Sequence, residues 1–161
     1  MLNRIVRWTP EGIEYEADPR QAEQLIRDLG MGGSKSVGTP GVQVTSEQLA
    51  EDKDLTYQRQ RPYRGVAARS NYLSADRPDM QHAAKEVCRW MSTPTETALL
   101  ALKRIGRHLG GHSRLVDRYD FQTATQIDCY SDTGWAGCPR TRRSTSGGCL
   151  MLGQHLIKTL Q

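Results

Sequence analysis

The residue of this chain whose type and position most clearly suggest chemistry is Asp132, in the stretch YSDTGWAG at residues 130–137. A carboxylate at this position could bind a metal ion, and a metal site made of carboxylates needs several of them close together. No Asp or Glu follows Asp132 in the sequence. Strand alternation puts Asp128 on the same face, but four residues at about 3.3 Å each separate the two by roughly 13 Å, so one metal ion cannot bind both.

Two groups of basic residues are candidate contacts for nucleic-acid phosphates. The first, Arg140, Arg142 and Arg143, follows the turn at Trp135. The second, Lys103, Arg104 and Arg107, lies on the polar side of a predicted helix. An ordinary solvated surface is the alternative interpretation of both groups.

Other chemical motifs are weak. The stretch GMGGSKS lacks the glycine before lysine and the preceding strand of a phosphate-binding loop. His108 and His112 could join Cys129 and Cys138 around zinc, but Gly110 and Gly111 are expected to break the helix that would align the two imidazoles. The four cysteines show no CxxC spacing and are expected to be reduced thiols.

Composition points to part of a larger soluble protein. Of 161 residues only 37% are apolar, and Phe121 is the single phenylalanine. The net charge of +4 is compatible with anionic partners without demanding them. No apolar run reaches the roughly 18 residues of a membrane span, and the first residues lack the apolar core of a signal peptide. We therefore expect no membrane contact and an intracellular location, cytoplasmic or nuclear.

Hydrophobic periodicity predicts the elements that would position these residues. Residues 3–8 and 13–17 should form a hairpin, and Asp18 with Pro19 should start a helix that ends at Gly30. Residues 31–55 are rich in Gly, Ser, Thr and charge and are expected to form a mobile linker. Two amphipathic helices follow, one stopped by Pro94 and one capped by Thr95. Three strand-like runs, 125–132, 142–153 and 154–160, complete the chain.

Two long stretches of the chain resemble the Pol polyprotein of copia-type LTR retrotransposons, where the reverse transcriptase passes into ribonuclease H. They are YRGVAARSNYLSADRPDMQHAAKEVCRWMSTPTETALLALKRIGRHLGG and CYSDTGWAGCPRTRRSTSGGCLMLG. The likeness is dense over residues 57–153, and residues 12–40 resemble the preceding segment. The Arg-Pro-Asp and Arg-Ser-Thr-Ser-Gly signatures are specific together.

The resemblance implies an RNA-directed DNA polymerase with an attached ribonuclease H. The polymerase's Tyr-x-Asp-Asp turn is absent from this sequence, so polymerase chemistry is not expected. Asp132 takes the place of the first metal-binding carboxylate of ribonuclease H, whereas Gly134 stands where the family commonly has a second Asp. The family implies Mg²⁺, which this chain alone is expected not to bind. The implied partners are an RNA–DNA hybrid or DNA and the rest of the polyprotein.

We therefore predict an α+β chain with an N-terminal hairpin and helix, an antiparallel helix pair, and a truncated three-stranded antiparallel ribonuclease H-like sheet. The expected regions are 1–38 (end of the reverse transcriptase), 39–62 (linker), 63–112 (helical connection) and 124–161 (incomplete ribonuclease H). The predicted function is a catalytically incompetent retrotransposon polyprotein fragment. The alternative is a nucleic-acid-binding or interaction module without catalysis. Without covering helices, the apolar residues Cys149, Met151, Leu156 and Ile157 should have one uncovered side.

Overall fold

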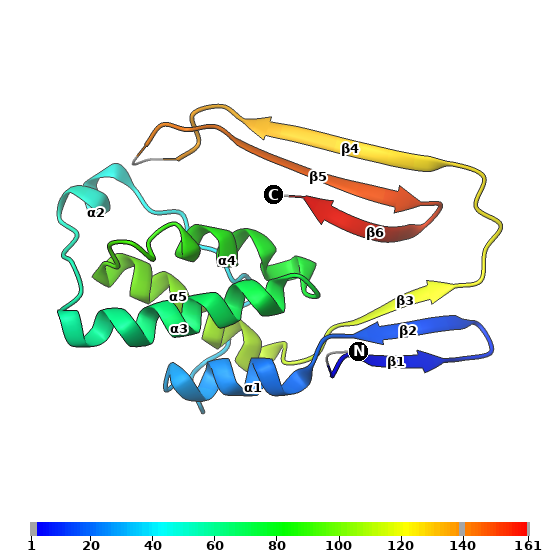
Figure 1. Cartoon of the computed structure of the whole chain (residues 1–161), viewed down its shortest axis with the longest axis horizontal. Coiled ribbons are helices and arrows are strands. Elements are labelled where there is room, and N and C mark those ends of the chain that lie inside the picture. Colours follow the sequence, from blue (N-terminus) through cyan, green and yellow to red (C-terminus); the bar gives the residue numbers. More distant parts are fainter. Residues whose placement is uncertain (1–2, 139–140, 161) are drawn as a thin grey trace. The chain divides into compact units, whose positions relative to one another are not determined.

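The computed structural model describes residues 3–138 and 141–160 and contains helices and antiparallel sheets, which confirms the α+β class (Figure 1). In the described residues the helices are α1 (Pro19–Asp28), α2 (Ser46–Ala50), α3 (Tyr57–Ser74), α4 (Gln81–Cys88) and α5 (Glu96–Gly111), with a 3-10 turn at Pro78–Met80. The strands are β1 (Ile5–Trp8), β2 (Gly12–Glu16), β3 (Val116–Asp120), β4 (Ile127–Gly134), β5 (Thr145–Leu152) and β6 (His155–Leu160).

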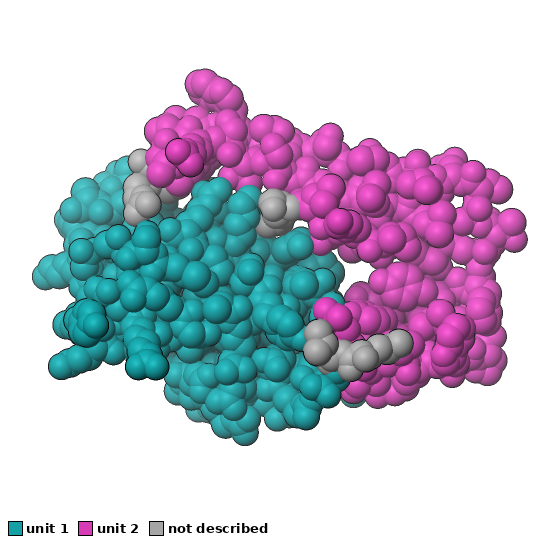
Figure 2. All heavy atoms as spheres, viewed as in Figure 1, with its two compact units in different colours: residues 1–3, 17–115 teal, residues 4–16, 116–161 magenta. Residues whose placement is uncertain are grey.

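The chain forms two compact units, which are coloured separately in Figure 2. Among the described residues, unit 1 consists of residues 3 and 17–115, and unit 2 of residues 4–16 and 116–160. The hairpin β1–β2 and the helix α1 fall in different units, although sequence analysis grouped them in the region 1–38. The four predicted region boundaries describe segments of a polyprotein, and they stay predictions.

Short-range signals predicted the N-terminal elements correctly. Strands β1 and β2 pair antiparallel, with Ile5 opposite Glu16 and Trp8 opposite Ile13. The Asp18 side chain accepts a hydrogen bond from the Arg20 amide at the start of α1, and Gly30 follows the helix with φ 64°. Positive φ suits glycine, which has no Cβ to clash in the left-handed region.

Unit 1 holds the hydrophobic core. Helix α3 packs on α1 and α4, and α5 packs on α1 and α4 (Figure 1). The core residues include the predicted apolar positions of α1, α4 and α5, with Leu25, Leu102 and Ile105 fully buried. Full burial of such a side chain contributes roughly 1.5–3 kcal/mol. The helical unit is therefore stabilised mainly by this apolar cluster.

The helical region differs from the sequence prediction in three respects. Helix α3, which sequence analysis did not predict, starts at Tyr57 and continues through Pro62. Pro62 removes one backbone hydrogen bond of α3, and the burial of Tyr63 and Ala67 in the core helps to offset this loss. Helix α4 ends at Cys88 rather than at Pro94, and α5 continues through Gly110 to Gly111.

Unit 2 contains two antiparallel sheets of three strands, ordered β1-β2-β3 and β4-β5-β6. The second confirms the three predicted C-terminal strands, whereas β3 was not predicted. Its pairing with β2, for example Tyr119 opposite Ile13, joins segments about a hundred residues apart in sequence, beyond the reach of local patterns. The Tyr119 hydroxyl donates to the Leu156 carbonyl over 3.3 Å, linking the sheets.

The strands of the second sheet have little cover. No described residue of β4, β5 or β6 is fully buried. Ile127 is 71% exposed, Tyr130 61% and Ile157 54%, while Cys149, Met151 and Leu156 are half-buried. The predicted lack of cover is thus most evident at Ile157. Among the described helices, none combines the length and apolar character that crossing a bilayer requires.

Candidate functional site

Asp132 lies in β4 and is exposed to solvent. It is paired with Gly147 of β5, which offers no side chain across the strand. One oxygen of the Asp132 carboxylate accepts a hydrogen bond from the Thr133 amide at 2.8 Å. The carboxylate is therefore placed on an ordered strand and is open to a ligand from solvent.

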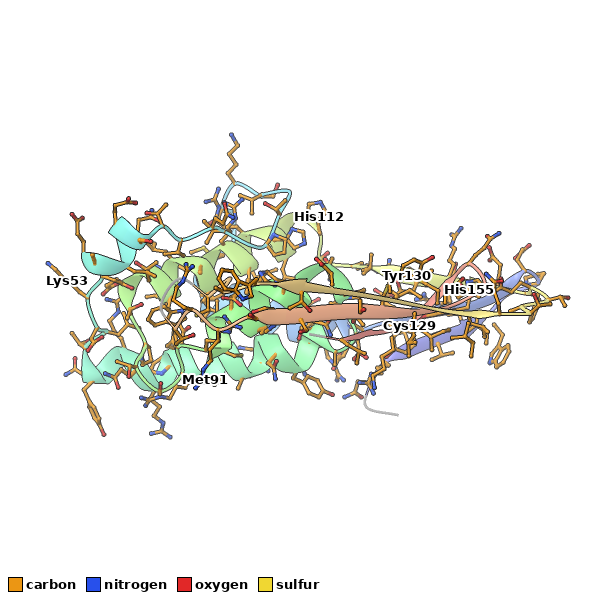
Figure 3. The ribbon with its side chains drawn as sticks, turned by 90° about the horizontal axis from the view of Figure 1, so that it is seen from above. Lys53, Met91, His112, Cys129, Tyr130 and His155 are labelled. Atoms are coloured by element: carbon orange, nitrogen blue, oxygen red, sulfur yellow. The ribbon has the colours of Figure 1, made fainter. Side chains whose placement is uncertain are left out.

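The surroundings of Asp132 contain few other ligand atoms. Strand register pairs Tyr130 with Cys149 and Asp128 with Met151, so these four side chains share the face of Asp132. Figure 3 labels Tyr130 and the neighbouring Cys129 in this region. The Asp128 carboxylate accepts hydrogen bonds from the Gln126 side chain. Across residues 3–138 and 141–160 no three His, Cys, Asp or Glu side chains are grouped so that they could hold a metal ion.

Two members of the first basic group lie in the turn that joins β4 to β5. Arg142 and Arg143 are exposed there. The Arg142 amide donates to the Cys138 carbonyl at 2.8 Å, and the Cys138 amide donates to the Arg143 carbonyl at 3.1 Å. Arg140, the third predicted contact, lies outside the described residues. The structure thus places two of the three predicted arginines on one hydrogen-bonded turn.

The second basic group lies on α5, where two of its members bind the preceding chain rather than facing solvent alone. Arg104 donates from Nε to the Thr39 carbonyl at 3.0 Å and from its second guanidinium nitrogen to the Thr39 hydroxyl at 2.9 Å. Arg107 donates from Nε to the Lys35 carbonyl at 2.9 Å. Lys103 is half-buried on the same helix. Phosphate binding by this group stays a prediction, and two of its members already have hydrogen-bonded partners.

Residues 35–39, which we call the strap, belong to the segment expected to be a mobile linker. Besides the two arginines, His108 contacts the strap through Nδ1 and the Val37 carbonyl at 3.2 Å. A Cβ built on Gly111 would lie only 2.6 Å from the Ser36 Cβ, so glycine permits the close approach. The strap is therefore held along the C-terminal half of α5. Sequence analysis could not detect this, because its partners lie some 70 residues away.

A buried polar cluster lies next to the strap and was missed as a site by sequence analysis. Arg77 is 2% exposed and forms a two-pronged ion pair with Asp79, at 2.9 and 2.7 Å. The same guanidinium donates to the carbonyls of His112 and Ser113 at 2.8 and 3.3 Å. It thus satisfies carbonyls that the end of α5 leaves without helical partners. Arg77 and Asp79 both belong to the Arg-Pro-Asp signature, and this signature was the feature of the sequence that could have indicated the cluster.

His108 completes this cluster. Its Nε2 lies 3.1 Å from the Asp79 carboxylate, and its Nδ1 faces the Val37 carbonyl, so both ring nitrogens face acceptors. Burial alone would raise the pKa of Asp79, but the hydrogen bonds and charges of Arg77 and His108 together hold it below its ordinary value. The arrangement connects α5, the Arg-Pro-Asp turn and the strap through the Arg77–Asp79 ion pair and the polar contacts of His108.

The expectation that Gly110 and Gly111 keep the two histidines apart is wrong. Because α5 continues to Gly111, the rings of His108 and His112 stack with centroids 4.6 Å apart (His112 is labelled in Figure 3). The other two residues of the imagined zinc set do not join them as ligands in the described part of the chain. The two imidazole rings pack against each other at the end of α5.

Comparison with known proteins shows what this chain is similar to. An uncharacterized mitochondrial protein of Arabidopsis thaliana, AtMg00810, is 29% identical over 155 residues. Two retrovirus-related Pol polyproteins of the same plant, from transposons RE1 and RE2, are 33% and 30% identical over 148 and 151 residues. No family model and no solved structure matches. These relatives confirm the resemblance to retrotransposon Pol polyproteins.

The matches cover most of this chain but only part of each relative. They include 92–94% of the chain, against 62% of the mitochondrial protein and 10% of either polyprotein. The chain is therefore similar to one segment of the polyprotein, and most of the polyprotein's length has no counterpart in this chain.

Proposed function

Since the chain is homologous to a segment of retrovirus-related Pol polyproteins, we propose that it corresponds to the junction of reverse transcriptase and ribonuclease H in a copia-type element. Three features support this assignment. The chain ends in three consecutive antiparallel strands, Asp132 stands on the first of them, and the resemblance implies this same arrangement. The exposed carboxylate is then the first metal-binding position of ribonuclease H.

We propose further that the chain alone does not hydrolyse RNA. The observation that carries this proposal is the isolation of Asp132: within the described residues it belongs to no group of three potential metal ligands. Two-metal hydrolysis needs carboxylates that converge from several elements. The donor set present does not fit the Mg²⁺ pair that the family implies, so Asp132 is an inherited position without its partners.

The test is cleavage of a labelled RNA–DNA hybrid in the presence of Mg²⁺ or Mn²⁺. The chain, Asp132→Asn and Asp128→Asn should all leave the hybrid intact, with a known ribonuclease H as the positive control. Asp128→Asn is a matched control because Asp128 lies on the same strand and face. Cleavage that is lost in Asp132→Asn but kept in Asp128→Asn would show that ligands come from elsewhere, for instance from a second copy.

A second candidate function is binding of nucleic acid without catalysis. It is favoured by the exposure of Arg142 and Arg143 on one ordered turn. Phosphate contacts release counterions, so the affinity for a hybrid should fall steeply with salt. Absence of binding even at low salt would exclude this candidate and leave the first proposal intact.

A further inference from the structure

The turn between β4 and β5 carries a large aromatic side chain that nothing in the described structure covers. Trp135, directly after β4, is 87% exposed. An indole of this size normally buries most of its surface in a core or an interface. Its position on the tip of a hairpin makes it available to a partner.

The described residues of this turn, 135–138 and 141–144, which we call the tip, are joined by several hydrogen bonds. Cys138 is buried at its centre, and the Thr141 amide lies 3.5 Å from the Cys138 Sγ. The Ala136 amide donates to the Ser144 hydroxyl at 3.2 Å, in addition to the two backbone hydrogen bonds between Cys138 and the residues Arg142 and Arg143. A partner would therefore meet a surface that is already arranged.

The backbone of the tip is strained at two residues. Ala136 has φ 50° and Arg142 has φ 55°, and both lie in the left-handed region that non-glycine residues rarely adopt. Such strain persists where surrounding contacts impose it, and it is concentrated at binding and catalytic sites. It is a second observation, independent of exposure, that marks the tip.

The charge of the tip is entirely positive. Arg142 and Arg143 are exposed, and among the described residues neither guanidinium has a hydrogen-bonded or ion-paired partner. No acidic residue follows Asp132 in the sequence, so no carboxylate of the turn competes with an incoming anion. The combination of an uncovered indole and two free guanidinium groups matches the two parts of a nucleotide, the base and the phosphate.

We propose that the tip binds an unpaired stretch of a polynucleotide, with a base stacked on Trp135 and the adjoining phosphates at Arg142 and Arg143. The inference rests on the nucleic-acid-binding candidate above and deepens it by naming the single-stranded class and the stacking residue. A single strand is favoured because only an unstacked base exposes a face to an indole, whereas paired bases inside a duplex do not.

The test is fluorescence anisotropy with labelled single-stranded RNA and DNA, and with a blunt duplex of the same sequence, in EDTA. Trp135→Ala should weaken single-strand binding about tenfold, whereas Trp135→Phe should retain most of the affinity. Replacing both Arg142 and Arg143 by Gln should reduce the slope of log affinity against log salt by about 1.4, because each single-strand phosphate contact contributes roughly 0.7.

Trp8→Ala is the matched control. Trp8 is 75% exposed, and its neighbour Arg7 is ion-paired with Glu14 and Glu16 instead of being free for a phosphate. The proposal would be overturned if Trp135→Ala left the affinity for single strands unchanged. It would also be overturned if Trp8→Ala lowered this affinity equally, or if Trp135→Ala lowered the affinity for the blunt duplex equally. Circular dichroism of each variant checks the fold. Because EDTA excludes cleavage, the result is independent of the assignment of Asp132.

Discussion

The helical unit and the C-terminal sheet are built from the same chain but are stabilised differently. In the helical unit, apolar side chains from four helices share one core, and the buried Arg77 and His108 side chains both contact the Asp79 carboxylate. Strands β4, β5 and β6 pair antiparallel along their length, with one register shift at Leu150–Met151, but no described side chain in them is fully buried. Backbone pairing alone contributes modestly to stability, because water competes for the same groups. The comparison teaches that an antiparallel sheet can form by backbone pairing and still lack a hydrophobic core.

The largest expected difference between the regions concerns core side chains. Leu102→Ala should destabilise the helical unit by about 3 kcal/mol, because it leaves a cavity at a fully buried position of α5. Leu100→Ala on the same helix should change the free energy of unfolding by less than about 0.5 kcal/mol, since Leu100 is 65% exposed. Urea unfolding followed by circular dichroism at a helical wavelength measures both. Equal losses would contradict the placement of the core.

Loss of the buried ion pair between Arg77 and Asp79 should destabilise the helical unit nearly as much as loss of a core side chain. Arg77→Ala leaves the Asp79 carboxylate and the last carbonyls of α5 without their main donor, and it should cost about 3 kcal/mol. Arg77→Lys should recover only part of the loss, since an ammonium cannot reproduce the two-pronged contact. The same unfolding experiment measures both variants. A fully stable Arg77→Ala would show that the cluster is dispensable.

Protonation of Asp79 at acid pH should lower the free energy of unfolding of the helical unit by less than Arg77→Ala does. Because the folded-state pKa of this carboxyl lies below its ordinary value of 3.8, its ionised form contributes stability above that pH. The contribution is lost as the pH falls through 3.8 toward the folded pKa. Asp79→Asn should therefore flatten the decline in stability between about pH 5 and pH 3. An unchanged pH profile in this variant would contradict the assignment.

Loss of a hydrogen-bonding side chain that holds the strap should lower the free energy of unfolding by less still. Arg104→Gln removes the guanidinium that donates to the Thr39 carbonyl and hydroxyl, and it should cost about 1 kcal/mol. Amide exchange in residues 35–39 should accelerate, while exchange in the middle of α5 should not. Arg142→Gln is the control, because its guanidinium has no hydrogen-bonded partner among the described residues. Slow exchange of the strap in both variants would show that Arg104 does not hold it.

The smallest effect on stability is expected in the sheet. Ile157→Thr should change the free energy of unfolding by less than about 0.5 kcal/mol, because Ile157 is 54% exposed. It should reduce self-association, which light scattering at increasing protein concentration would detect. A large loss of stability would mean that the side chain is covered in solution.

Sequence patterns anticipated most of the secondary structure and less of the site. The caps at Asp18 and Thr95 and the alternation in the last three strands are short-range signals, and all three were confirmed. Helix α3 was missed because a polar start and Pro62 hide its apolar positions. The position of Asp132 on a strand was anticipated, whereas its role and those of the predicted phosphate contacts stay predictions.

By itself the sequence determined the N-terminal hairpin, helix α1, the stripes of α4 and α5 and the last three strands, and that residues 133–161 contain no Asp or Glu. These properties depend on neighbouring residues or on composition alone. Only the tertiary structure decided that β3 joins the N-terminal hairpin, that Arg104 and Arg107 bind the strap, and that Asp79 meets His108. Each of these contacts joins residues some 30 to 100 positions apart. Which polar groups satisfy one another therefore depends on how burial brings distant segments together, and local propensity does not encode it.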